Sequence, residues 1–189
     1  SITGAVQLGQ GFNKYEECSP HEQNILSPFR DATKATEEKG EAKNSTLGTK
    51  VVTDEAHYFY PFVINPASYD DYVALGVTEG YTEEDYKKFK ETALVSATAF
   101  ATNAKEGCEN EFALFVETDS DLYLPNLTSY LTFEKGEEKD VITISAANIL
   151  DEVKDQIKSI EVYYNPHTTE VVCDIENTKY YHIITRKEV

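Results

Sequence analysis

Apolar and polar positions alternate along several short segments of the chain, and this period of two is typical of β-strands. Val6 and Leu8 follow it within residues 2–16, where three interspersed glycines indicate bends or a close approach of two backbones. Residues 51–64 carry a dense run of aromatic and β-branched side chains. That run predicts one long strand, ended by the proline at position 66.

Apolar positions with a helical period appear in three other places. Thr82 precedes three acidic residues and apolar positions up to about Ala101, so it is predicted to cap the N-terminus of a central helix. The alanine- and threonine-rich end of this helix predicts burial against a sheet. A short helix is predicted over residues 67–75, and Ser145 is predicted to cap a helix that carries apolar side chains as far as Ile157.

Short β-branched and aromatic runs bounded by turn residues predict further strands at 112–118, 141–144, 160–164, 171–175 and 180–184. We expect the last three of these to form a terminal group joined by turns. Residues 122–133 are also apolar, but a proline interrupts them. Because strands and helices are mixed without a strict βα repeat, the pattern predicts an α+β fold in a single domain, residues 1–189.

A long polar segment separates the first two apolar regions. Residues 18–50 are mostly polar, with a highly charged stretch at their centre. A segment of this length and composition inside a compact domain is typical of a functional loop or a hairpin tip.

Composition favours a folded chain and makes nucleic-acid binding harder to explain. Of the 189 residues, 40% are hydrophobic and 12% aromatic, enough to form a core, whereas 34 acidic against 17 basic residues give a net charge of −17. Such a charge repels phosphates at long range. Three widely spaced cysteines favour a reducing compartment over a disulfide framework. No apolar run reaches the roughly 18 residues that a membrane span needs, so we expect a cytoplasmic protein without a membrane partner.

Motifs of common enzymes are absent from the sequence. It contains no glycine-rich phosphate loop, no zinc-protease His-Glu-x-x-His and no Gly-x-Ser-x-Gly elbow. Cys18 and His21 have the spacing of a ligand pair, but no second pair follows them, so neither a metal site nor a cofactor is predicted. Adjacent carboxylates such as Glu83 and Glu84 are interpreted as solvated or as partners of helix dipoles. We therefore expect a protein without catalytic residues.

The basic residues point to one part of the chain. Lys14, Arg30 and Lys50 flank the polar segment, Phe29 stands beside Arg30, and Lys105 occupies a second loop. A projecting hairpin with basic and apolar side chains could grip a single nucleic-acid strand through its backbone and through stacking. An ordinary solvated loop remains the alternative.

Seven stretches, in this order and spacing, resemble the family of backbone subunits of type I CRISPR effector complexes, the Cas7 group: residues 3–14, 47–50, 60–66, 80–85, 102–105, 122–127 and 160–165. Within this family the chain resembles the type I-B branch, known as the Csh2 subunit. The resemblance covers the C-terminal two-thirds of such a subunit. We therefore expect Ser1 to be an internal start, with the N-terminal part of the subunit missing.

The resemblance implies a fold that is built from three substructures. It implies an RRM-like (ferredoxin-like) palm with a β-hairpin thumb and a helical insertion. The thumb would fall in residues 18–50, the helical lobe and central helix in 65–103, and the remainder of the palm in 110–189.

The resemblance also implies a function in antiviral defence, as a non-catalytic subunit of a Cascade complex. The partners would be CRISPR RNA, neighbouring copies of the same subunit and other subunits of the complex. Several relatives carry an arginine where Asn103 stands. The RNA-binding residues implied are Gln7, Gln10, Asn13, Lys14, Phe29, Arg30, Lys50, Asn103 and Lys105.

Two other hypotheses stay open. The acidity would suit a protein-interaction module, or a mimic of the subunit, that contacts members of the complex without RNA. Relatives in type III complexes cleave RNA with an aspartate of the thumb, and Asp31 lies in the corresponding region. A metal-dependent ribonuclease is therefore the third hypothesis.

Overall fold

The structure, a computed structural model, describes residues 2–26 and 47–189. The chain divides into two compact units. The larger unit contains the N-terminal residues up to Lys14 together with Tyr58–Val189, and the smaller unit is Tyr15–His57. Each unit is described by itself.

The larger unit contains ten strands among its described residues. They are β1 (Val6–Leu8), β2 (Phe12–Asn13), β5 (Tyr58–Phe59), β6 (Phe62–Ile64), β7 (Phe112–Thr118), β8 (Leu131–Glu134), β9 (Asp140–Ile144), β10 (Ile157–Tyr164), β11 (Thr169–Cys173) and β12 (Lys179–His182). They form two three-stranded sheets, ordered β12-β10-β7 and β11-β9-β8, and two pairs, β1-β6 and β2-β5.

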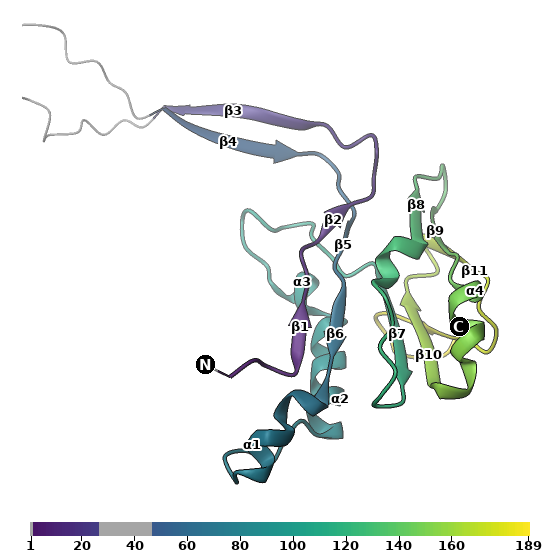
Figure 1. The fold of residues 1–189 in the computed structure, drawn as a ribbon. Coiled ribbons are helices and arrows are strands. Elements are labelled where there is room, and N and C mark those ends of the chain that lie inside the picture. The colour runs from purple at the N-terminus through teal and green to yellow at the C-terminus, as the bar shows by residue number, and fades with distance from the viewer. Residues whose placement is uncertain (1, 27–46) are drawn as a thin grey trace, which may run out of the picture. The chain divides into compact units, whose positions relative to one another are not determined.

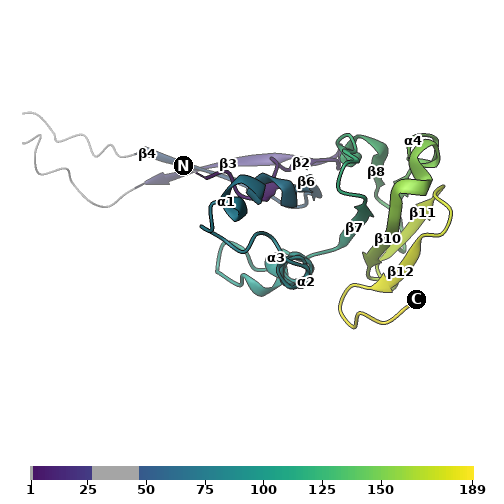
Figure 2. The same ribbon diagram turned by 60° about the horizontal axis from the view of Figure 1, so that its bottom comes forward.

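Short helices connect these strands, as Figures 1 and 2 show. The α-helices are α1 (Asp70–Ala74), α2 (Glu83–Ala93), α3 (Ser96–Ala99) and α4 (Ala147–Leu150), and the 3-10 helices are η2 (Pro66–Tyr69), η3 (Leu127–Tyr130) and η4 (Asp151–Gln156). Small sheets with few helices confirm the predicted α+β class and are compatible with an RRM-like fold. No helix among the described residues is both long and apolar enough to cross a bilayer.

Strand β10 is buried on both faces, so the core of the larger unit forms around it. Ile160 and Val162 join one apolar cluster with Leu150 of α4, whereas Tyr163 belongs to a second cluster with Phe115 of β7. Alternate residues of a strand point to opposite faces, and here each face finds its own partners. Val162 is 0% exposed.

The prediction of one long strand over residues 51–64 is wrong. Strand β4 (Leu47–Thr53) ends first, and β5 and β6 follow as separate short strands. Pro61 lies between β5 and β6, where its ring removes the N–H that a continuous strand would donate.

The prediction that the central helix continues to Ala101 is also wrong, because the side chain of Asn110 divides it. Its Nδ2 donates to the carbonyl oxygen of Ala93, the last residue of α2, over 2.8 Å. Its Oδ1 accepts from the N–H groups of Ala97 and Thr98, over 2.9 and 3.2 Å. One amide thus satisfies backbone groups of both α2 and α3. The predicted burial of the alanine- and threonine-rich end against a sheet holds only for its start: Leu94 packs with Phe115 and Tyr163, whereas α3 has no buried residue.

Helix α4 begins one residue later than predicted, and its cap comes from elsewhere in the chain. Ala146, rather than Ser145, occupies the N-cap position, and it has no side chain that could accept a hydrogen bond. Asp174, just after β11, supplies the acceptor: its Oδ1 accepts from the N–H groups of Ala146 and Ala147, each over 3.0 Å. The helix then continues directly as the 3-10 helix η4.

The three terminal strands do not form the predicted group joined by turns. β12 pairs with β10 in parallel, whereas β11 lies in the other sheet, parallel to β9. Neighbours in sequence are therefore not neighbours in a sheet, because parallel pairing needs a crossover between the two strands.

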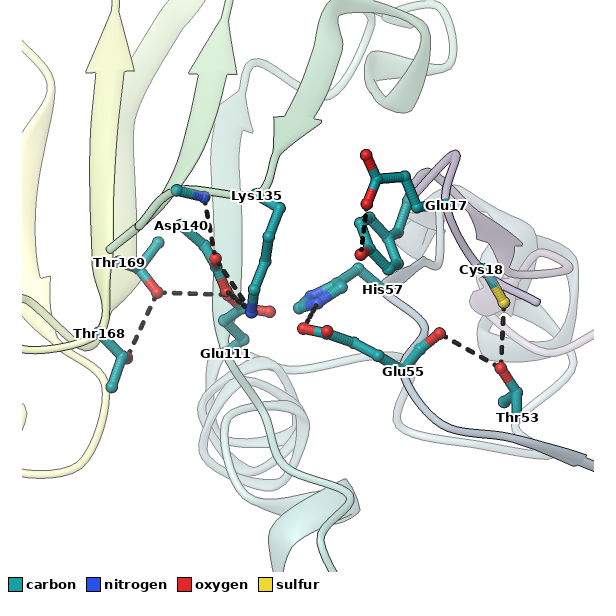
Figure 3. Close-up of polar contacts among 12 residues, drawn as sticks. Glu17, Cys18, Thr53, Glu55, His57, Glu111, Lys135, Asp140, Thr168 and Thr169 are labelled. Atoms are coloured by element: carbon teal, nitrogen blue, oxygen red, sulfur yellow. Dashed lines mark hydrogen bonds and ion pairs between the residues drawn. The ribbon is translucent and has the colours of Figure 1, made fainter. Parts of the chain in front are cut away.

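The smaller unit contains an antiparallel strand pair. β3 (Pro20–Leu26) pairs with β4, from Pro20 opposite Thr53 to Leu26 opposite Leu47 (Figure 1). At the base of the pair, Cys18 Sγ lies 3.1 Å from the Thr53 hydroxyl, which donates to the Glu55 carbonyl oxygen over 3.2 Å (Figure 3). The predicted thumb-like segment 18–50 thus includes a strand pair at its two ends, while its centre lies outside the described residues.

Candidate nucleic-acid interface

Two segments of the larger unit, residues 2–13 and 58–69, contain no charged side chain in a chain with a net charge of −17. They run antiparallel, as β1 beside β6 and β2 beside β5. Between these pairs, the Gly9 N–H donates to the Pro61 carbonyl oxygen over 2.7 Å. We call the two segments the neutral ribbon. Since it carries no carboxylate of its own, repulsion of a phosphate is weaker there than beside the acidic segments.

Aromatic side chains alternate between the two faces of this ribbon. Phe59 points inward, where its ring lies 6.2 Å from that of Phe112. Tyr58 and Tyr60 are instead 53% and 57% exposed. Their ring centroids are 6.4 Å apart and their planes are inclined by 36°. Two solvent-facing phenol rings thus lie close together, one on β5 and one directly after it.

The glycine at position 11 makes room for one of these rings. A Cβ at Gly11 would lie 2.7 Å from Cδ1 of Tyr60 and closer still to Cε1 and Cζ. A side chain at position 11 would force the Tyr60 ring to shift, so with glycine there the ring lies directly against the backbone. This contact covers one side of the Tyr60 ring, while 57% of the residue stays exposed.

Three uncharged residues of the predicted RNA-binding set lie along the ribbon. Gln7 is exposed on β1, and its Nε2 donates to the Gly4 carbonyl oxygen over 2.7 Å. Gln10 is exposed between β1 and β2. Asn13 is half-buried and stands opposite Tyr58 in the β2–β5 pair, so both residues project from the same face.

Lys14, also predicted to bind RNA, is held by the protein itself. Its Nζ donates to the carbonyl oxygens of Thr128 and Leu131, over 2.6 and 2.7 Å. It also lies 5.7 Å from the centre of the Phe59 ring. An ammonium group has three N–H donors, so two of them are occupied and one is left. The side chain joins the end of β2 to η3 and β8.

The other predicted residues belong to segments outside the ribbon. Lys50 is exposed on β4 of the smaller unit, opposite Gln23. Asn103 and Lys105 are exposed in the loop after α3, where the Lys105 N–H donates to the Thr102 carbonyl oxygen over 2.9 Å. Phe29, Arg30 and the alternative nuclease residue Asp31 lie outside the described residues.

Among the ion pairs of the described residues, the most enclosed one between a lysine and a carboxylate is part of the core. Lys90 of α2 forms an ion pair with Glu161 of β10, and each side chain is only 19% exposed. Lys90 Nζ lies 5.2 and 5.4 Å from the ring centres of Phe115 and Tyr163, and the Tyr163 hydroxyl donates to Glu161 over 2.8 Å. Burial alone raises the pKa of Glu161, but the hydrogen bonds from Lys90 and Tyr163 outweigh it and leave that pKa below its ordinary value. These charges stabilise the packing of α2 on β10.

Several other charged groups have local partners, as Figure 3 shows. Lys135 lies 3.3 Å from a carboxylate oxygen of Asp140 within the larger unit. In the smaller unit, His57 Nε2 lies 3.1 Å from Glu55 Oε1. His21 pairs with Asp54 over 3.4 Å, whereas Cys18 contacts Thr53. Cys18 and His21 therefore each have their own contact instead of a shared one.

The exposed tyrosine pair was not among the predicted site residues. The alternation Tyr-Phe-Tyr before a proline indicated a strand, and the same alternation places both tyrosines on one face. The additional signal was the absence of charge in two separate segments. This absence of charge indicates a shared uncharged surface only once the pairing of the two segments is known.

Comparison with known proteins gives one match. The sequence model of the family described as CRISPR-associated protein Cas7 matches residues 1–163. This range includes both segments of the neutral ribbon and strands β3 and β4. No curated protein and no solved structure matches the chain.

Proposed function

This chain belongs to the Cas7 family of CRISPR-associated proteins, and on that premise we propose that it is a backbone subunit that binds guide RNA in a type I effector complex. The observation that carries the proposal is the family match over residues 1–163 of 189. The type I-B branch, a cytoplasmic location and a non-catalytic role are parts of the same proposal.

The exposed basic and amide residues support RNA contact. Lys50 and Lys105 are both exposed, so their ammonium groups can approach phosphates. Asn103 lies in the same loop as Lys105 and offers an amide to sugar or phosphate oxygens. In a chain with a net charge of −17, such contacts must be local, because long-range attraction is missing. Neighbouring copies and the other subunits are the protein partners that we propose.

Guide-RNA binding by the full chain at several salt concentrations tests this function. The double variant Lys50→Glu, Lys105→Glu should bind far more weakly than wild type. Replacing each lysine by glutamine should make the slope of log affinity against log salt shallower by about 0.7 per lost phosphate contact. The matched control is Lys88→Glu, Lys158→Glu, which changes the net charge equally at two other exposed lysines.

The double variant and its control separate a local contact from a charge effect. If both double variants weakened binding equally, the two proposed lysines would have no special role. Wild-type chain that fails to bind guide RNA at any salt concentration would refute the proposed function itself.

A second candidate function is a protein-interaction module that joins the complex without RNA. The excess of 34 acidic over 17 basic residues favours it, since acid surfaces attract basic partner proteins. Assembly with the other subunits after complete removal of RNA by nuclease would support this candidate. Loss of assembly under the same treatment would support the RNA-binding subunit.

A further inference from the structure

We propose that Tyr58 and Tyr60 form a platform on which an unpaired nucleobase of the bound RNA stacks. The proposal rests on the proposed RNA-binding function and adds a residue-level contact to it. None of the residues predicted from the sequence supplies this contact, since the described ones are amides and lysines.

The first argument is the rigidity of the platform. Tyr58 belongs to β5, which pairs with β2 through Phe12 opposite Phe59 and Asn13 opposite Tyr58. Phe59, between the two tyrosines, is anchored against Phe112. Tyr58 therefore projects from a paired strand, and Tyr60 lies between this strand and the hydrogen bond from Gly9 to Pro61. Rings that are already ordered lose less conformational entropy on binding a ligand than mobile ones do.

The second argument is that one side of the platform is supported and the other is open. The Tyr60 ring lies against the backbone of Gly11, where a Cβ would collide with the ring. The two tyrosines are nevertheless 53% and 57% exposed. Among the described residues, neither phenol oxygen has a hydrogen-bond partner. A ring supported from behind and open in front can stack with a flat, aromatic ligand.

The third argument concerns the chemistry of the ligand. The ribbon has no charged residue, so it lacks the cations that hold phosphates. A nucleobase has a π-face for the two rings and polar edges for hydrogen bonds. On a strongly acidic chain, stacking offers affinity that does not require a basic groove.

Tyrosine and RNA variants test this proposal in the full chain. The double variant Tyr58→Ala, Tyr60→Ala should weaken binding of a single-stranded RNA by at least about fivefold, the lower end of one base–aromatic stack. Tyr58→Phe, Tyr60→Phe keeps the rings and should bind like wild type. Gly11→Ala should also weaken binding, because its Cβ displaces the Tyr60 ring. Thermal unfolding of each variant would establish that it is folded.

Two controls make the contact specific. Tyr123→Ala removes a tyrosine that is 67% exposed outside the ribbon and should leave binding unchanged. An RNA of the same length with abasic sugars keeps every phosphate but has no base to stack. It should bind more weakly to wild type, and its affinity should not depend on Tyr58 or Tyr60.

The possible outcomes separate this inference from the proposed function. If wild type binds RNA but the double alanine variant binds it equally well, the platform is refuted and the function stands. The same holds if the abasic RNA binds as tightly as the normal one. If the variant keeps RNA affinity but loses association with a second copy of the chain, the surface is a protein contact and the inference is wrong. If wild type binds no RNA, both the platform and the proposed function are refuted.

Discussion

At the scale of single residues, the partners of a lysine decide what its charge does. Lys14 donates to two carbonyl oxygens, and Lys90 pairs with Glu161 beneath aromatic rings. Lys50 and Lys105 are exposed. The sequence alone does not distinguish these four lysines. In the structure, two of them have partners that stabilise the fold, and the other two are exposed and can approach a phosphate. Contacts from residues 71 to 117 positions away cause this difference, so no local pattern could predict it.

Lys90→Met should lower the free energy of unfolding by about 2 kcal/mol near neutral pH, because Glu161 then stays mostly buried without its cation. The folded-state pKa of Glu161 lies below its ordinary value of 4.5. The wild-type pair therefore stabilises fully above that pH and loses its contribution as the pH falls through the lowered pKa. The difference between variant and wild type should shrink in acid. Urea unfolding across this pH range measures it.

The matched control for this pair is Lys88→Met. Lys88 lies on the same helix and pairs with Glu84 at the surface, where the loss should stay below about 1 kcal/mol. A difference between Lys90→Met and wild type that did not change with pH would contradict the role assigned to Glu161.

Lys14→Met should destabilise the fold by about 1–3 kcal/mol, because the carbonyl oxygens of Thr128 and Leu131 each lose a charged donor. The salt dependence of RNA binding should stay as in wild type. Denaturant unfolding and binding at two salt concentrations measure the two effects. Unchanged stability with a shallower salt dependence would instead show that Lys14 contacts phosphate.

At the scale of elements, side chains from distant segments decide where helices begin and end. Asn110 separates α2 from α3, and Asp174 caps α4 from the end of β11. Local signals did predict the Thr82 cap of α2, where Thr82 and Asp85 form a reciprocal capping box. A cap within four residues is visible in a sequence, whereas one supplied from 27 residues away is not.

Asp174→Ala should destabilise the larger unit by about 1 kcal/mol, since two N–H groups at the start of α4 lose their acceptor. Asp174→Asn keeps an oxygen in place and should cost less. Chemical denaturation of both variants measures the difference. Equal losses for alanine and asparagine would show that the hydrogen bonds to Oδ1 are not what stabilises this helix start.

At the scale of the whole molecule, several strands were predictable from the sequence, whereas their pairing was not. β7 was predicted with its observed bounds, because alternation along one strand is a local property. The parallel pairs β10–β12 and β9–β11 depend on crossovers that no turn motif records. The neutral ribbon has the same origin. Each of its segments looks unremarkable alone, and only their pairing brings Tyr60 onto Gly11.

The two units should differ in local stability. In the smaller unit, the side chains of β3 and β4 are mostly exposed, and an isolated strand pair is marginally stable. β10 is buried on both faces. Amide hydrogen exchange should therefore be fast in β3 and β4 and slow in β10. Equal protection in both places would show that the strand pair opens only when the whole chain unfolds.

The close approach of the two ribbon segments also determines which mutations the ribbon can tolerate. A side chain at Gly9 would collide with the Pro61 ring, and one at Gly11 with the Tyr60 ring. Gln10 lies between them and is exposed, so it can be exchanged freely as far as packing is concerned. A side chain at position 9 or 11 thus requires a neighbouring ring to shift, whereas one at position 10 does not. Substitutions of Gln10 are therefore expected to change the exposed surface of the ribbon without disturbing its strand pairing.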